Sequence, residues 1–222
     1  MKHPKMAATN AEVVLYSYWR SSCSWRVRTA LALKGLLKDN CEIIAVNLLD
    51  DEQKTEGYGE VNPMHQVPSL AVEDGTKVLT QSVAIMEYIE EAFPEPALLP
   101  KDMWKRAQVR EIVNLIASGI QPLQNLSVLR KLPEGHRKEW GEFHIRKGFI
   151  ALEAILKKTS GKYCVDDDIS LADVCLVPQV FNASRFQLDM TDFPTISDIY
   201  CRLIQHPAFE EAKPENQPDV PK

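Results

Sequence analysis

Hydroxyl and thiol side chains gather at one junction near the start of this chain. Ser21, Ser22 and Cys23 follow an alternating stretch, 12–18, that predicts a strand, and they open a helical pattern over 23–34. The first backbone N–H groups of a helix lack an intrahelical partner and carry partial positive charge, so the junction favours an anion. A hydroxyl placed there can donate to a bound thiolate. A plain helix cap needs one serine, so the whole group indicates a functional site.

Two other junctions offer polar backbone or side-chain groups. Pro68 opens a predicted strand, and a cis peptide there would free the Val67 N–H and C=O to pair with a peptide-like ligand. General X-Pro statistics favour the trans alternative, in which Pro68 only starts the strand. Gln81 and Ser82 precede a helix, at a place suited to an α-carboxylate. A plain N-cap at Ser82 is the alternative.

A third group follows Pro122, which removes a backbone donor and should kink the long helical pattern over 103–130. A kink frees carbonyl groups that need one or two polar partners. The segment supplies more than that, from Gln121, Gln124, Asn125 and Ser127.

The elements that would position these groups form two patterns. Strand 12–18, helix 23–34 with Gly35 at its C-cap, strand 41–46, a hairpin of 67–72 and 77–79, and helix 82–92 follow one another. The order β-α-β-(α)-β-β-α is that of an α/β thioredoxin-like domain over 12–92, after a flexible tail at 1–11. Pro94, Pro96 and Pro100 mark a linker at 93–102.

The rest of the chain, 103–222, predicts an all-α domain. Helical patterns cover 103–130 and 134–158, and a third helix follows Ser170, where Asp173 completes a capping-box-like start. The part after Pro207 is a Pro-rich, polar tail.

Composition excludes several classes of function. The 222 residues carry a formal net charge of −5, which argues against a nucleic-acid-binding protein. No apolar run approaches the roughly 20 residues that span a membrane, and no secretory signal is apparent. Five scattered cysteines show no zinc-ligand spacing, so we expect a reduced, cytoplasmic protein without metal.

Together the motifs resemble the zeta class of the cytosolic glutathione transferases, from about Val14 onward. The resemblance rests on 21–28, 62–68, 81–85, 119–127 and 171–179. It implies glutathione-transferase architecture, glutathione as cofactor, a homodimer, and maleylacetoacetate isomerase activity. It also implies a cis peptide before Pro68, which overrides the statistical preference for trans.

The resemblance also implies roles for individual residues. Ser21, Ser22 and Cys23 surround the glutathione sulfur, and Val67 pairs with the cysteinyl backbone. Gln81 and Ser82 hold the γ-glutamyl end. The remaining residues implied to bind glutathione are Ser24, Trp25, Arg26, Gln53 at the glycyl end, Pro68, and Gln121, Asn125, Leu126 and Ser127 from the second domain.

The implied reaction is addition of the glutathione thiolate to the cis double bond of maleylacetoacetate, rotation, and departure of the thiolate, without consumption of glutathione. Ser21 is our first candidate for the thiolate donor, with Ser22 and Cys23 as alternatives. The substrate is a dianion and the chain is acidic, so the site needs local positive charge. Arg28 and Arg185 are the candidates for its carboxylates.

Two other functions remain open. Cys23 could be a redox nucleophile at the helix terminus, which would give a glutathione-dependent thiol transferase or dehydroascorbate reductase. The chain could also be a non-catalytic carrier or assembly module of the same fold. General conjugation, including dehalogenation of α-haloacids, is the side activity that the resemblance implies.

Overall fold

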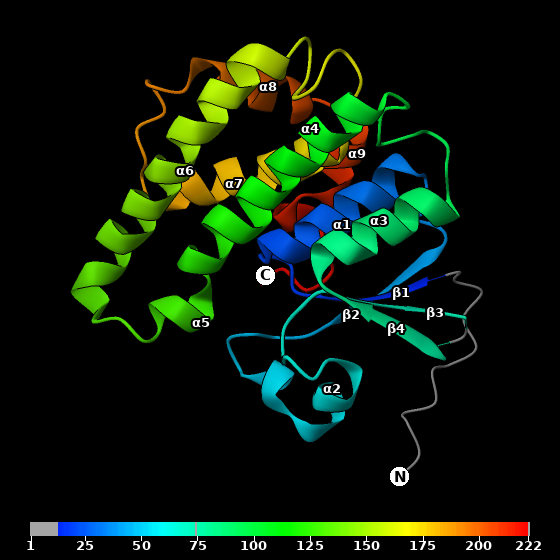
Figure 1. Ribbon diagram of the computed structural model, residues 1–222. Helices are drawn as coiled ribbons and strands as arrows, with labels where there is room; N and C mark the ends of the chain where they lie inside the picture. The colour runs from blue at the N-terminus through cyan, green and yellow to red at the C-terminus, as the bar shows by residue number, and fades with distance from the viewer. Residues whose placement is uncertain (1–12, 74, 222) are drawn as a thin grey trace. The chain divides into compact units, whose positions relative to one another are not determined.

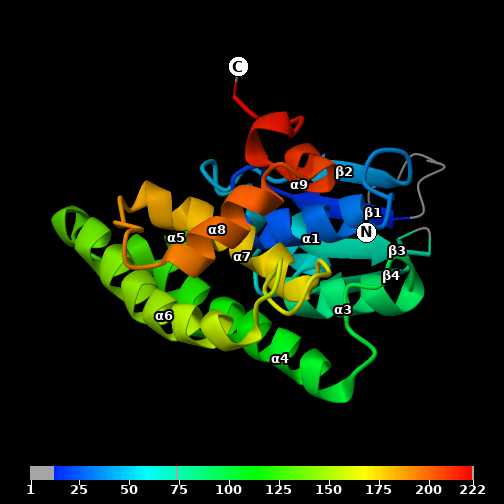
Figure 2. The same ribbon diagram turned by 90° about the horizontal axis from the view of Figure 1, so that it is seen from above.

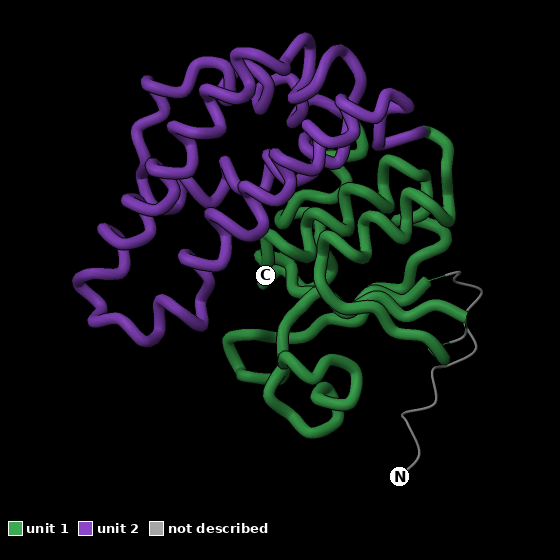
Figure 3. The backbone as a smooth tube through the Cα atoms, in the orientation of Figure 1, with its two compact units in different colours: residues 1–96, 207–222 green, residues 97–206 purple. Residues whose placement is uncertain are grey.

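The computed structural model describes residues 13–73 and 75–221, so the tail predicted at 1–11 lies outside the described residues. The chain forms two compact units, shown in different colours in Figure 3. Unit 1 combines residues 1–96 with 207–222, and unit 2 spans 97–206. The division between Pro96 and Ala97 falls inside the predicted linker.

Unit 1 is built on a four-stranded mixed sheet with the strand order β2-β1-β3-β4. Strand β1 is parallel to β2 and antiparallel to β3, which is antiparallel to β4. Val13, Val14 and Leu15 of β1 are all buried, as expected for a central strand that is covered on both faces. The strands are β1 (Val13–Ser17), β2 (Cys41–Ala45), β3 (Ser69–Val72) and β4 (Lys77–Thr80).

Helices cover both faces of this sheet. α1 (Ser22–Leu33) and α3 (Ser82–Ala92) lie on one face, and α2 (Glu56–Val61) lies on the other (Figure 1). The predicted apolar face of α1 is fully buried at Val27, Ala30 and Leu31. Gly35 follows the helix with φ of 72°, the left-handed conformation that a C-cap glycine provides. The predicted thioredoxin-like fold is confirmed.

The end of the chain differs from the prediction. Residues after Pro207 form a short helix, α9 (Pro207–Ala212), that packs against α1 in unit 1. The Ala212 carbonyl accepts from Arg28 Nε at 3.0 Å, and Asp219 Oδ2 accepts from the Trp19 N–H at 2.8 Å. The helical unit therefore ends at residue 206 rather than 222. These polar contacts join residues 184 and 200 positions apart in the sequence. Local periodicity cannot predict contacts over such separations.

Unit 2 is helical apart from an isolated bridge between Ser160 and Asp166. The pattern over 103–130 is interrupted as predicted, by a π-helical turn at Leu115–Ile120 and a 3-10 turn at Gln121–Gln124 that contains Pro122. The α-helices of this unit, seen from above in Figure 2, are α4 (Met103–Asn114), α5 (Leu126–Leu129), α6 (Arg137–Thr159), α7 (Leu171–Arg185) and α8 (Pro194–Leu203).

A buried carboxylate fixes the start of α7. Asp173 accepts from the Ser170 N–H at 2.9 Å and the Ser170 hydroxyl at 2.8 Å, which confirms the predicted capping box. Its other oxygen accepts from the Cys164 N–H at 2.9 Å. Burial raises the pKa of Asp173, and the hydrogen bonds from Cys164 and Ser170 oppose that shift. One side chain thus joins α7 to the loop that precedes it.

We predict that Asp173→Ala lowers the free energy of unfolding by about 2–4 kcal/mol, because two buried backbone N–H groups lose their acceptor. Asp168→Ala, at an exposed position of the same loop, is the matched control and should change stability by less than about 0.5 kcal/mol. Urea unfolding followed by circular dichroism measures both. Equal midpoints for the two variants would contradict this role of Asp173.

Candidate functional site

The strand register brings three junctions to one end of the sheet in unit 1. Tyr16 near the end of β1 pairs with Ser69 at the start of β3, and Ser69 pairs with Thr80 at the end of β4. Neighbouring strands lie about 5 Å apart. The turn into α1, the segment before β3 and the entry to α3 therefore leave the sheet side by side. The register unites groups that are about 60 positions apart in the sequence.

Ser21 is the N-cap of α1. Its Oγ accepts from the Ser24 N–H at 3.2 Å, and its carbonyl accepts from the Trp25 N–H at 2.8 Å. A hydroxyl that accepts with its oxygen keeps its proton to donate, so the capping role leaves Ser21 able to serve a thiolate. Ser22 is buried, whereas Cys23 is half-buried with a free thiol. Capping and thiolate donation are therefore compatible at Ser21.

Val67 and Pro68 are joined by a cis peptide, as predicted. Within the described residues, the backbone N–H and C=O of Val67 form no hydrogen bond. The carbonyl of the preceding residue, Gln66, accepts from Tyr58 Oη and from Asn62 Nδ2, each at 2.7 Å. Burial raises the pKa of Tyr58 to about 12, so its hydroxyl remains a donor at neutral pH.

Sequence reasoning assigned no role to Tyr58 or Asn62, although they position this segment. The run 62–68, which carries part of the resemblance, contains Asn62 and was the available signal.

The entry to α3 lacks a conventional cap. Gln81 occupies the N-cap position with φ of 72°, and its side chain accepts no hydrogen bond from the helix. The first turn of α3 contains no acidic residue. Ser82 is buried, and its Oγ accepts from Arg26 Nη1 at 3.2 Å. A helix N-terminus whose first turn has no side-chain cap and no acidic residue favours binding of a carboxylate.

Gln53 lies in a 3-10 turn, Glu52–Lys54, which follows β2 and precedes α2 in the chain. Its side chain is mostly buried, and its Nε2 donates to Asp51 Oδ1 at 3.3 Å. Its Oε1 is buried without a partner among the described residues. His65 Nδ1 is hydrogen-bonded to the Gln53 carbonyl at 2.8 Å. The turn is therefore held in place, with one amide oxygen left for another donor.

Arg28 does not serve a substrate carboxylate. Its side chain is fully buried, and its guanidinium donates to Ser17 Oγ and to the carbonyls of Tyr18, Trp19 and Ala212, at 2.9–3.3 Å. Burial lowers the pKa of Arg28 to about 9, and the charge of Asp219 opposes that shift. The sequence interpretation is wrong here because the Arg28 guanidinium is buried and already donates to acceptors within the protein, so it is not available to a substrate carboxylate.

The remaining predicted residues lie in unit 2. Asn125 caps the short helix α5, where its Oδ1 accepts from the Ser127 N–H at 3.0 Å and Oγ at 2.9 Å. Gln121 is half-buried at the end of the π-helical turn, and Leu126 is partly exposed. Arg185 is exposed at the last position of α7. The structure thus brings 121–127 together and places Arg185 on a separate element.

Among the described residues, no group of three or more His, Cys, Asp or Glu side chains could hold a metal ion. The same residues include no helix that is long and apolar enough to cross a membrane.

Comparison with known proteins agrees with this geometry. The family model of the glutathione S-transferase N-terminal domain matches residues 20–92, and that of the C-terminal domain matches residues 142–207. The chain belongs to the glutathione transferase family. The predicted resemblance is confirmed, including its zeta class.

Several family members that are similar in sequence and structure carry isomerase names. Maleylacetoacetate isomerase of Mus musculus is 55% identical over 94% of this chain and 95% of its own length. A crystal structure of maleylacetoacetate isomerase from Anaeromyxobacter dehalogenans with bound glutathione is 46% identical, with a TM-score of 0.87 over 96% of this chain and all of that one. A zeta-class maleyl pyruvate isomerase is 38% identical, with a TM-score of 0.88 over 94% and 100% of the two chains.

We predict that Arg28→Lys lowers the free energy of unfolding by about 2–4 kcal/mol, since an ammonium cannot reproduce the forked geometry that satisfies several acceptors. Arg20→Lys, at a half-buried position of the same turn, is the control and should be close to neutral. Thermal and urea unfolding measure the change. A stable Arg28→Lys protein whose only defect is a raised KM for a dianionic substrate would restore the original carboxylate assignment.

Proposed function

We propose that the protein is a glutathione-dependent isomerase that converts maleylacetoacetate to fumarylacetoacetate, a step of tyrosine and phenylalanine catabolism. The observation that carries this proposal is the 55% identity to an isomerase of that name over nearly the whole chain. The proposal is also supported by the strand register, which brings Ser21, Val67 with its cis Pro68, and Ser82 to one end of the sheet. Conjugation, including that of α-haloacids, is the expected side activity.

The residues present fit glutathione. The α1 and α3 starts offer helix N-termini for a thiolate and a carboxylate, and the Val67 backbone offers one donor and one acceptor to a peptide. Bound glutathione would supply the thiolate that adds to and later leaves the substrate's double bond. Ser21 donates its hydroxyl proton toward that sulfur and, with the start of α1, favours its ionised form.

The other predicted residues belong to this proposal as well. Gln81 and Ser82 hold the γ-glutamyl end, and Gln53 offers its unpartnered amide oxygen to the glycyl part. Arg185 grips a substrate carboxylate, for which its exposed position and planar guanidinium are suited. Gln121, Asn125, Leu126 and Ser127 are the further residues that we propose to bind glutathione.

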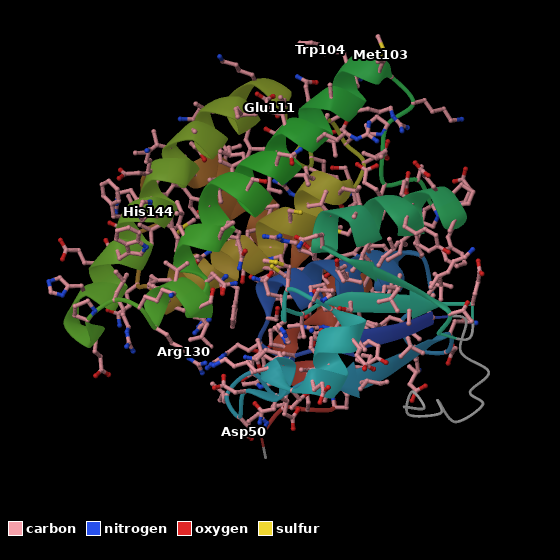
Figure 4. The ribbon with its side chains drawn as sticks, turned by 60° about the horizontal axis from the view of Figure 1, so that its bottom comes forward. Asp50, Met103, Trp104, Glu111, Arg130 and His144 are labelled. Atoms are coloured by element: carbon pink, nitrogen blue, oxygen red, sulfur yellow. The ribbon has the colours of Figure 1, made fainter. Side chains whose placement is uncertain are left out.

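We also propose that the protein works as a homodimer in the cytoplasm. Met103 and Trp104, at the start of α4, are 84% and 72% exposed and project outward together (Figure 4). Adjacent exposed side chains of this size favour a protein partner, and a second copy is the proposed one. Sedimentation velocity of the purified protein distinguishes the dimer from a monomer.

The decisive experiment mixes purified protein with maleylacetoacetate, or its analogue maleylacetone, with and without glutathione. We expect loss of the cis isomer only when glutathione is present, with no net consumption of glutathione. The Cys23→Ser variant separates this function from the redox alternative, because it should retain isomerisation but abolish any thiol transferase or dehydroascorbate reductase activity. Glutathione binding without turnover in the wild type would favour a carrier module instead.

We predict that Arg185→Ala raises the KM for the dianionic substrate about tenfold or more while the Kd for glutathione stays within twofold, because a charged hydrogen bond to a carboxylate is lost. Lys158→Ala, at an exposed position on α6, is the control for a lost surface cation and should leave both constants unchanged. Steady-state kinetics and calorimetric titration give the two constants. Equal loss of substrate and glutathione affinity would contradict a role specific to the substrate.

A further inference from the structure

One peptide group in unit 1 lies between two opposite charges. The Trp19 N–H donates to Asp219 Oδ2 at 2.8 Å, and the Tyr18 carbonyl accepts from Arg28 Nη1 at 3.3 Å. The carbonyl of Tyr18 and the N–H of Trp19 belong to the same peptide group. Its acceptor end therefore faces a guanidinium and its donor end faces a carboxylate, an arrangement that polarises the peptide and strengthens both hydrogen bonds.

This peptide group also fixes the residue that begins α1. The Ser21 N–H donates to the Tyr18 carbonyl at 3.0 Å, which closes the turn between β1 and α1. Arg28 Nη2 holds the next carbonyl, that of Trp19, at 2.9 Å. A rotation of the peptide between Tyr18 and Trp19 would break the hydrogen bond from Ser21 and move the N-cap hydroxyl. The acceptor of the Trp19 N–H thus helps to determine where the Ser21 hydroxyl lies.

The C-terminal segment presents Asp219 from a turn that is itself held in place. The Val220 N–H donates to the Gln217 carbonyl at 3.3 Å, and Pro218 fixes one backbone angle inside that turn. Gln217 is buried, and its Nε2 donates to two carbonyls of the preceding segment, at 3.1 and 2.9 Å. Together with the packing of α9 against α1 (Figure 2), these hydrogen bonds hold the Asp219 carboxylate beside the turn that precedes α1.

Asp219 also acts through its charge. Its Oδ1 is buried without a hydrogen-bond partner among the described residues, so burial of the carboxylate is costly. The nearby positive charge of Arg28 offsets part of that cost. Burial lowers the pKa of Arg28, and the charge of Asp219 opposes that shift. A neutral side chain at position 219 could accept from the Trp19 N–H, but it would not stabilise the guanidinium that holds the carbonyls of the same turn.

We propose that Asp219 is a positioning residue for Ser21, holding the turn at Tyr18 and Trp19 so that the Ser21 hydroxyl donates to the sulfur of glutathione. This role rests on the proposed function. Asp219 acts through the backbone of the turn, and its effect reaches the thiolate only by way of Ser21. The C-terminal segment, which local sequence patterns leave without a function, thereby supports the site at the start of α1.

The test is a double-mutant cycle of Asp219→Ala and Ser21→Ala in the full chain. In the wild-type background we expect Asp219→Ala to lower kcat for glutathione-dependent isomerisation roughly tenfold to a hundredfold, because a displaced hydroxyl no longer meets the sulfur. In the Ser21→Ala background the same substitution should change kcat by less than about twofold, since the group that it positions is absent. Glu215→Ala, at an exposed position of the same segment, is the control and should leave kcat unchanged.

Spectroscopy separates positioning of the hydroxyl from a general loss of structure. Ultraviolet absorbance of the bound thiolate, followed against pH, gives the apparent pKa of the glutathione thiol. Asp219→Ala should raise that pKa by about one unit, whereas the Kd of S-methylglutathione, which has no ionisable thiol, should stay within about twofold of the wild-type value. Asp219→Asn keeps an acceptor for the Trp19 N–H and should recover part of the lost kcat.

Equal losses of kcat in the two backgrounds, or an unchanged thiol pKa in a folded Asp219→Ala protein, would overturn the proposal. If Asp219→Ala does not fold, the same cycle and titration on Asp219→Asn decide. Equal losses in the two backgrounds, or an unchanged kcat and thiol pKa, overturn the proposal there as well. Absence of glutathione-dependent turnover in the wild type would instead refute the proposed function.

Discussion

The first unit depends on the hydrogen bonds of the Arg28 guanidinium, in which every nitrogen has an acceptor. It ties the side chain at the end of β1 and two carbonyls of the following turn to the last residue of α9. The turn that it braces carries Ser21, whose hydroxyl must be held at the start of α1. The Trp19 N–H donates to Asp219 from the same C-terminal segment. Arg28, which the sequence suggests for substrate binding, instead fixes the backbone that presents the hydroxyl and thiol groups.

Arg26 and Arg28 show how one helix can use identical side chains in opposite ways. Positions two apart on an α-helix point to different sides, so Arg28 faces the turn and α9 while Arg26 faces α3. Among the described residues, Arg28 donates to carbonyls and a hydroxyl, whereas Arg26 contacts only the Ser82 hydroxyl and the more distant Cys23 thiol. Both are buried. Among the described residues, the fold provides acceptors for every guanidinium nitrogen of Arg28 but none for Nε and Nη2 of Arg26.

The sequence predicted the local structure well because local signals determine it. Alternation over 12–18, the apolar face of α1 and the Pro122 break each arise from neighbouring residues, and each corresponds to an observed element. The motifs at Ser21, Val67 and Ser82 could also be recognised from sequence. The return of α9 to unit 1 and the acceptors of Arg28 could not, because those contacts join residues about 190 positions apart. Composition cannot distinguish a cation that meets such partners from one that does not.

The site depends on register more than on any single residue. The paired residues Tyr16, Ser69 and Thr80 place three chain segments at one end of the sheet. The starts of α1 and α3 and the backbone N–H and C=O of Val67 therefore lie within a few strand spacings of about 5 Å. A shift of one residue in the pairing register of β3 would exchange its two faces and displace the backbone of Val67. The buried contacts of Tyr58 and Asn62 with the Gln66 carbonyl oppose such a slip from outside the sheet. A tripeptide with a thiol at its centre and a carboxylate at its γ-glutamyl end matches that spacing, because each helix start then receives one negative charge and the peptide edge receives the backbone between them.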